Sequence, residues 1–100
     1  MNADSTNEQS GAGSGKSIPL PQVTFSTFVL SIASTALVHL GEVPEPESGE
    51  MREDLLAARH NIDVLAMIKE KTSNNLDDDE NRLLDGVLYE LRMKYVIKSK

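Results

Sequence analysis

Two histidines, His39 and His60, are the side chains of this chain best suited to general acid or base chemistry. They fall on different predicted helices, and the sequence places no acidic side chain to orient either imidazole. We expect His39 to be a capping or interface residue in the last turn of its helix and His60 to be solvated. The chain has no cysteine, which excludes a thiol nucleophile, a thiolate metal site and disulfides.

A glycine-rich segment, Gly13–Ser17, resembles the end of a phosphate-binding loop. The complete motif needs another glycine at the place that Ser10 occupies, together with a preceding strand and a following helix. Pro19 and Pro21 hinder the start of a helix directly downstream. We therefore interpret the segment as a flexible linker and predict that it does not bind a nucleotide.

Four consecutive acidic residues, Asp77–Glu80, raise the possibility of a calcium site. A calcium-binding loop that began at Asp77 would need glycine and glutamate at the positions of Arg82 and Leu88, so the match fails. Acidic residues in a first helical turn are explained by capping and by the helix dipole. The sequence therefore predicts no catalytic residue, no metal and no cofactor, and we expect that the protein is not an enzyme.

A long uncharged run, Ser17–Gly41, is followed by the acidic, proline-broken stretch Glu42–Glu47. So large an apolar surface has to be buried in the protein's own core, in a partner chain or in a membrane. The first 22 residues are polar and predict a disordered tail, which leaves one domain over residues 23–98. A single core of this size is marginal, and oligomerisation is a common remedy.

Composition narrows the partners and the compartment. The net charge of -6 argues against a general affinity for nucleic acid or for an anionic membrane. The N-terminus lacks the basic start and adjoining apolar region of a secretory signal. Together with the absence of cysteine, this indicates a cytoplasmic protein.

The pattern of residues 23–98 predicts an all-α fold, a small three-helix domain. Gly41 is placed to end the first helix in a left-handed cap. Asp54 is the expected N-cap of the second helix, and Asp77 with Glu80 forms a capping box at the start of the third. The helices are expected at about 24–40, 54–73 and 78–97.

The first predicted helix is apolar over well over half of its circumference, and its remaining arc carries small hydroxylated side chains, including Thr27, Ser31 and Thr35. Such side chains can donate to carbonyls of their own helix, so they tolerate burial and close packing. We expect this helix to be enclosed on most sides. Thr27, Ser31, Thr35 and His39 are therefore candidates for an interaction surface.

The third predicted helix carries two apolar stripes where a three-helix monomer uses one. The second stripe contains Tyr89, Met93, Val96 and Ile97, and Gly86 lies on it. A glycine inside a helix costs about 1 kcal/mol relative to alanine unless close backbone approach recovers it. Gly86, Tyr89 and Met93 are thus candidate contacts with another chain; the alternative is scattered apolar residues on a helix surface.

A membrane crossing by the first helix is not expected. Val23–Leu40 would span about 27 Å at the helical rise, less than the hydrocarbon thickness of about 30 Å. Seven of these eighteen residues are Ser, Thr or His, and no basic residue or Trp marks either end.

The sequences of the three predicted helices and of the segments between them resemble a known family. The segments are VTFSTFVLSIASTALVHLGEVPEPESGE, LAARHNIDVLAMIKEKTSNNL and DDDENRLLDGVLYELRMKYV, and the most specific part is the first helix with its ending His39–Gly41. Together they resemble the bacterial domain-of-unknown-function family numbered 1844. The resemblance implies a short helical protein with a variable polar tail and supplies no catalytic residues.

We therefore expect a cytoplasmic interaction module that forms a homodimer or binds another protein, with no nucleic acid partner. The alternative is a membrane-associated accessory protein whose first helix inserts.

Overall fold

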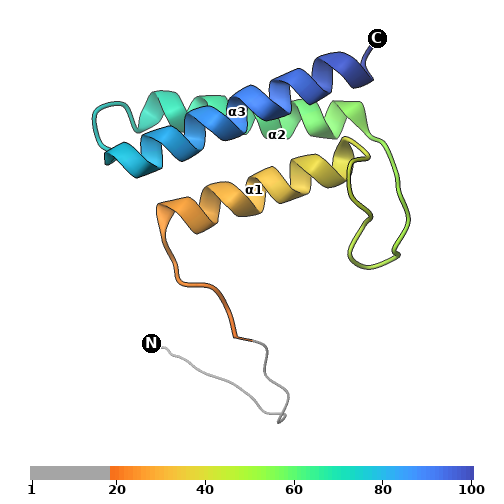
Figure 1. The fold of residues 1–100 in the computed structure, drawn as a ribbon, viewed down its shortest axis with the longest axis horizontal. Helices are drawn as coiled ribbons and strands as arrows, with labels where there is room; N and C mark the ends of the chain where they lie inside the picture. Colours follow the sequence, from red (N-terminus) through yellow and green to blue (C-terminus); the bar gives the residue numbers. More distant parts are fainter. Residues whose placement is uncertain (1–18) are drawn as a thin grey trace.

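The computed structural model describes residues 19–100, and within that range the chain forms three α-helices and no strand (Figure 1). The predicted all-α, three-helix fold class is confirmed. The helices start and end within two residues of the predicted positions. Most of the predicted tail, 1–22, and all of the segment Gly13–Ser17 lie outside the described residues. The helices are α1, Phe25–His39; α2, Leu55–Lys71; and α3, Asp78–Lys98.

The helices form an up-down-up bundle in which α1 and α3 run in the same direction and α2 runs against them (Figure 1). Each helix contacts the other two. The core lies along their shared axis and consists of small and branched apolar side chains that recur at helical spacing. Its buried members are Val29, Ala33, Ala36, Leu40, Ala58, Ile62, Leu65, Leu84, Leu88 and Leu91.

Side chains cap the N-terminus of every helix. Asp54 Oδ1 accepts the backbone N–H of Ala57 at 3.1 Å. In α3, Asp77 Oδ1 accepts the N–H of Glu80 at 2.8 Å, and Glu80 Oε1 accepts the N–H of Asp77 at 3.0 Å. The predicted caps of α2 and α3 are therefore present, and each satisfies N–H groups that a helix start leaves unpaired.

The end of α1 is set by Gly41, whose φ is +76°. The N–H of Gly41 donates to the carbonyl of Val38 at 3.0 Å, and the N–H of Glu42 donates to that of Leu37 at 3.0 Å. This is the Schellman arrangement that the left-handed residue allows. The predicted cap is thus present, and the chain turns at Gly41 into the α1–α2 loop.

The α1–α2 loop is fastened back onto the end of α1. The N–H of Asp54 donates to the carbonyl of His39 at 2.7 Å, and Leu40 pairs with Glu53 in an isolated antiparallel bridge. These contacts place the start of α2 directly beside the end of α1, at the end of the bundle where α3 finishes (Figure 1).

No helix within residues 19–100 combines the length and the apolar character that a membrane crossing requires.

Candidate interaction surface

The outward face of α1 carries the predicted hydroxyl residues, and the expectation that α1 is enclosed on most sides is wrong within the monomer. Ser31 and Thr35 are exposed, and Thr27 is half-buried. The Ser31 hydroxyl donates to the carbonyl of Phe28 at 2.7 Å, and that of Thr35 donates to Ser31 at 3.2 Å. Each hydroxyl is polar and keeps acceptor capacity for water, so the face can be solvated without charged side chains.

Thr27 has a structural role that the sequence reasoning missed. Its Oγ1 accepts the N–H of Thr24 at 3.1 Å, while Thr24 Oγ1 accepts the N–H of Thr27 at 3.0 Å. The Thr27 hydroxyl also lies 2.7 Å from the carbonyl of Gln22, to which it donates. The pair forms a capping box in which Thr takes the place of the usual Glu or Gln, so the usual sequence pattern of the motif is absent.

His39 lies in the last turn of α1, half-buried against the α1–α2 loop. It lines a hollow with Glu45, Arg52, Glu53 and Asp54. Among residues 19–100, no carboxylate oxygen lies within 4.0 Å of an imidazole nitrogen. The same part of the chain holds no group of His, Asp or Glu side chains arranged to bind a metal.

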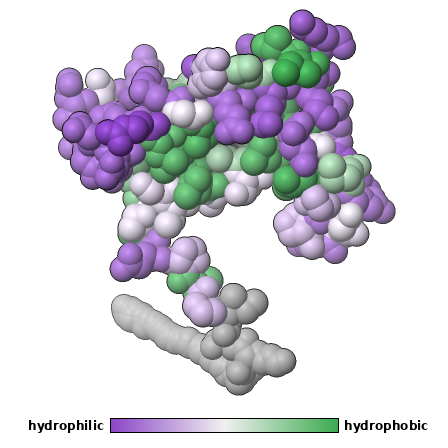
Figure 2. Space-filling model, viewed as in Figure 1, coloured by the Kyte–Doolittle hydropathy of each residue, from purple (hydrophilic) through white to green (hydrophobic). Residues whose placement is uncertain are grey.

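The outward face of α3 carries the second apolar stripe, which we name the α3 ridge: Gly86, Tyr89, Met93, Val96 and Ile97. The exposed fractions are 68% for Tyr89, 47% for Met93, 54% for Val96 and 64% for Ile97. The buried residues of α3 lie on the opposite side of the helix. Figure 2 shows apolar side chains gathered on the surface near the C-terminal end of α3.

Gly86 has no close neighbour in the monomer. A Cβ atom added there would meet no heavy atom within 4 Å, and the residue is exposed. Nothing inside the described chain therefore recovers the cost of a glycine in the middle of α3. The interpretation of Gly86 as a close contact with another chain stays a prediction.

Two shallow hollows border the ridge. The larger one, about 590 Å³, is lined by residues of α2 and α3, among them Lys69, Asp85 and Arg92. Lys69 pairs with Asp85 and so ties α2 to α3 at its margin. The other hollow, about 420 Å³, lies on the far side of Tyr89 and Met93. The ridge thus stands between two depressions that can receive side chains of another surface.

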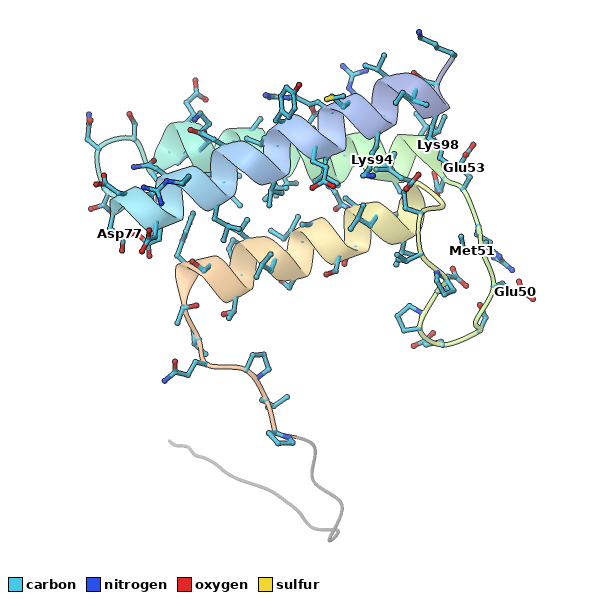
Figure 3. All side chains as sticks on the ribbon, viewed as in Figure 1. Glu50, Met51, Glu53, Asp77, Lys94 and Lys98 are labelled. Atoms are coloured by element: carbon cyan, nitrogen blue, oxygen red, sulfur yellow. The ribbon has the colours of Figure 1, made fainter. Side chains whose placement is uncertain are left out.

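An ion-pair cluster that the sequence did not indicate joins the end of α3 to the α1–α2 loop (Figure 3). Lys94 Nζ lies 3.5 Å from Glu42 Oε1, and Lys98 Nζ lies 3.6 Å from Glu42 Oε2 and 3.9 Å from Glu53 Oε2. The side chains of Glu42, Lys94 and Lys98 are each 31% exposed. The acidic loop and the basic helix end are each visible in the sequence, but only the fold shows that they meet.

The predicted surface residues therefore divide between two helices. The outward face of α1 holds hydroxyls that already have partners, and the outward face of α3 holds apolar side chains and a glycine that have none in the bundle. Of the two, only the α3 ridge presents large apolar area beside hollows. The predicted residues do not converge on a catalytic arrangement.

Comparison with known proteins supports the family resemblance. No curated protein and no solved structure matches the chain. A family model described as Domain of unknown function (DUF1844) matches residues 22–97, a range that includes all three helices except the last residue of α3. The chain therefore belongs to the DUF1844 family, as the first helix with its His39–Gly41 ending suggested.

Proposed function

We propose that this protein is a non-enzymatic, cytoplasmic interaction module that binds another protein chain, a second copy or a different protein, through the α3 ridge. One observation carries the proposal: four large apolar side chains of one helix stand exposed on the side away from the core. Removal of such apolar area from water is the dominant favourable contribution to most protein–protein association.

The arrangement of the ridge favours binding over scattered surface exposure. Tyr89, Met93 and Ile97 follow one another at intervals of four residues, so they line up along one side of α3. Aromatic residues and Met are the types that interface cores concentrate. Isolated apolar residues are common on any surface, but a continuous row beside two hollows is typical of a docking face.

The proposal predicts that assembly depends on the ridge and not on α1. Size-exclusion chromatography with light scattering, in buffer without detergent, would measure the mass of the full chain and of Met93→Glu. In parallel, immobilised chain would capture partners from a lysate of the native host. Ser31→Glu is the matched control, because it adds the same charge to the outward face of α1.

We expect the wild type and Ser31→Glu to behave alike, and Met93→Glu to lose its assembly or its captured protein. If the wild type and both variants have the same mass and capture the same proteins, the ridge is not a binding surface and the proposal is wrong. A wild type that stays in solution only with detergent would instead favour the membrane-associated alternative.

A further inference from the structure

The charges of α3 are separated along its length. From Asp78 to Glu90 the helix carries five carboxylates and one arginine. From Leu91 to Lys100 the chain carries four basic residues and no acidic one. This distribution suits the dipole of α3 itself. Because Lys94 and Lys98 are already paired with Glu42 and Glu53, and Asp85 with Lys69, it is mainly Arg92 and Lys100 in the basic half that make the surface around the ridge complementary to the acidic half of a reversed copy.

Side-chain size along the ridge also differs between the acidic and the basic half of α3. The acidic half of the ridge ends in Gly86, above which a Cβ would find open space within 4 Å. The basic half ends in Val96 and Ile97, which are 54% and 64% exposed. The ridge is therefore hollow at one end and prominent at the other. A reversed copy would place its prominent end over the hollow one.

Resting on the proposed function, we infer that the ridge binds a second copy of this chain, with the two α3 helices antiparallel about a two-fold axis midway between Tyr89 and Met93. Tyr89 of each copy then lies beside Met93 of the other. Gly86 of each copy faces Val96 and Ile97 of the other. The apolar contact extends over about 17 Å of helix at the α-helical rise.

A parallel pairing is worse on both counts. It would place the acidic half of α3 against the acidic half and align the two helix dipoles side by side. It would also oppose Gly86 to Gly86 and Ile97 to Ile97, which leaves a gap at one end and crowding at the other. A two-fold antiparallel contact uses the same patch on both copies and closes on itself, so it forms a discrete dimer and no filament.

The absence of native cysteine allows a direct test of direction. Arg82 lies on α3 in line with the ridge, and Lys100, two residues beyond the end of α3, is separated from the inferred axis by the same number of residues. Arg82 makes only an exposed ion pair with Asp79, at 3.3 Å, so its replacement is well tolerated. Full-length Arg82→Cys and Lys100→Cys would be prepared separately, mixed, and treated with a bis-maleimide linker of about 10 Å, close to the usual spacing of packed helices.

We expect a discrete dimer by sedimentation equilibrium and, in the mixture, a crosslink between the two different variants that mass spectrometry identifies. Each variant alone is the matched control and should crosslink at least tenfold less. Crosslinks between like variants, in the controls and in the mixture, would overturn the antiparallel arrangement.

A second measurement separates this inference from the proposed function. Ile97→Glu, checked for helix content by circular dichroism, should weaken dimerisation at least tenfold. A monomeric wild type at several hundred micromolar would overturn the inference of a second copy. If that monomer still captures another protein through the ridge, the proposed function survives; if Ile97→Glu changes neither mass nor capture, both are wrong.

Discussion

The outward faces of α1 and α3 are both poor in charge near their centres, yet they meet water in different ways. On α1, hydroxyls such as those of Ser31 and Thr35 donate to carbonyls of their own helix. On α3, Tyr89 and Ile97 expose apolar area that no group of the bundle covers. A helix face without charged side chains can therefore either be solvated through its hydroxyl groups or expose uncovered apolar area. We therefore take large apolar area that nothing in the bundle covers, and not the lack of charge, as the sign of an interface.

Phe28 and Leu30 make this comparison testable, because they too are about half exposed, on α1. They lie on opposite sides of the hydroxyl arc and do not form a row. The largest expected effect is therefore a matched pair of aromatic truncations. Tyr89→Ala should weaken association by about 30-fold, roughly 2 kcal/mol, as an aromatic contact central to an interface does. Phe28→Ala should leave the dissociation constant within about twofold, since α1 makes no contact in the inferred dimer.

Sedimentation equilibrium over a concentration series would give both dissociation constants. Equal losses for Tyr89→Ala and Phe28→Ala would show that the faces of α1 and α3 do not differ in function. A larger loss for Phe28→Ala would reverse the comparison.

Gly86→Ala should act on folding and on association with opposite signs. The new methyl group meets open space and replaces the worst non-proline helix former, so the unfolding free energy of the monomer should rise by about 1 kcal/mol. The same methyl group fills the hollow end of the ridge, so dimerisation should weaken several-fold. Thermal unfolding at low micromolar concentration and sedimentation at high concentration separate the two effects.

Ser34→Ala is the control for that substitution on α1, where Ser34 is exposed. It should raise helix stability by roughly half as much and leave association unchanged. Stabilisation of Gly86→Ala together with tighter association would mean that the glycine is not a contact.

The N-caps of α1 and α3 should contribute equally to the unfolding free energy, although one is a threonine and the other an aspartate. Thr24→Ala and Asp77→Ala should each lower the unfolding free energy by about 1 kcal/mol, because each leaves helix-start N–H groups without a partner. Thr27→Val, which removes only the hydroxyl that completes the α1 capping box, should lower the melting temperature without changing the mass of the assembly. A change of mass in Thr27→Val would return Thr27 to the interface.

The smallest expected effect concerns the ion-pair cluster. Lys98→Met keeps the apolar stem and removes the contacts to Glu42 and Glu53. It should lower the unfolding free energy by a few tenths of a kcal/mol, and about 0.5 M salt should abolish the difference from the wild type. The control is Arg59→Met on α2, which breaks an exposed ion pair with Asp63 within the same helix. It should lower the unfolding free energy by no more than Lys98→Met does.

The helices and their ends were predictable because their signals are local. Gly41, Asp54 and the Asp77–Glu80 box act within a few residues of their own position, and each acts in the structure as expected. The composition of α1 could not predict whether neighbouring helices enclose it. Burial depends on where neighbouring helices lie, and hydroxyl side chains are compatible with both solvent and core.

The pairings between distant charges had no sequence signal either. Lys69 meets Asp85 and Lys98 meets Glu53 only because the bundle brings α2, α3 and the loop together. Exposed charges pair with whichever opposite charge lies near, so no fixed spacing identifies them. By contrast, the second stripe of α3 was visible as periodicity, and its exposed residues are those that the spacing indicated.

The ion-pair cluster also affects the conformational mobility of the last turns of α3. The end of a helix ordinarily opens and closes readily, and its amide hydrogens exchange early. Here Lys94 and Lys98 are held by the α1–α2 loop, on either side of the turn that carries Val96 and Ile97. The loop therefore lowers the conformational entropy that this turn would lose on contact with another surface. A change in the acidic loop can in this way alter the affinity of a face that it does not touch.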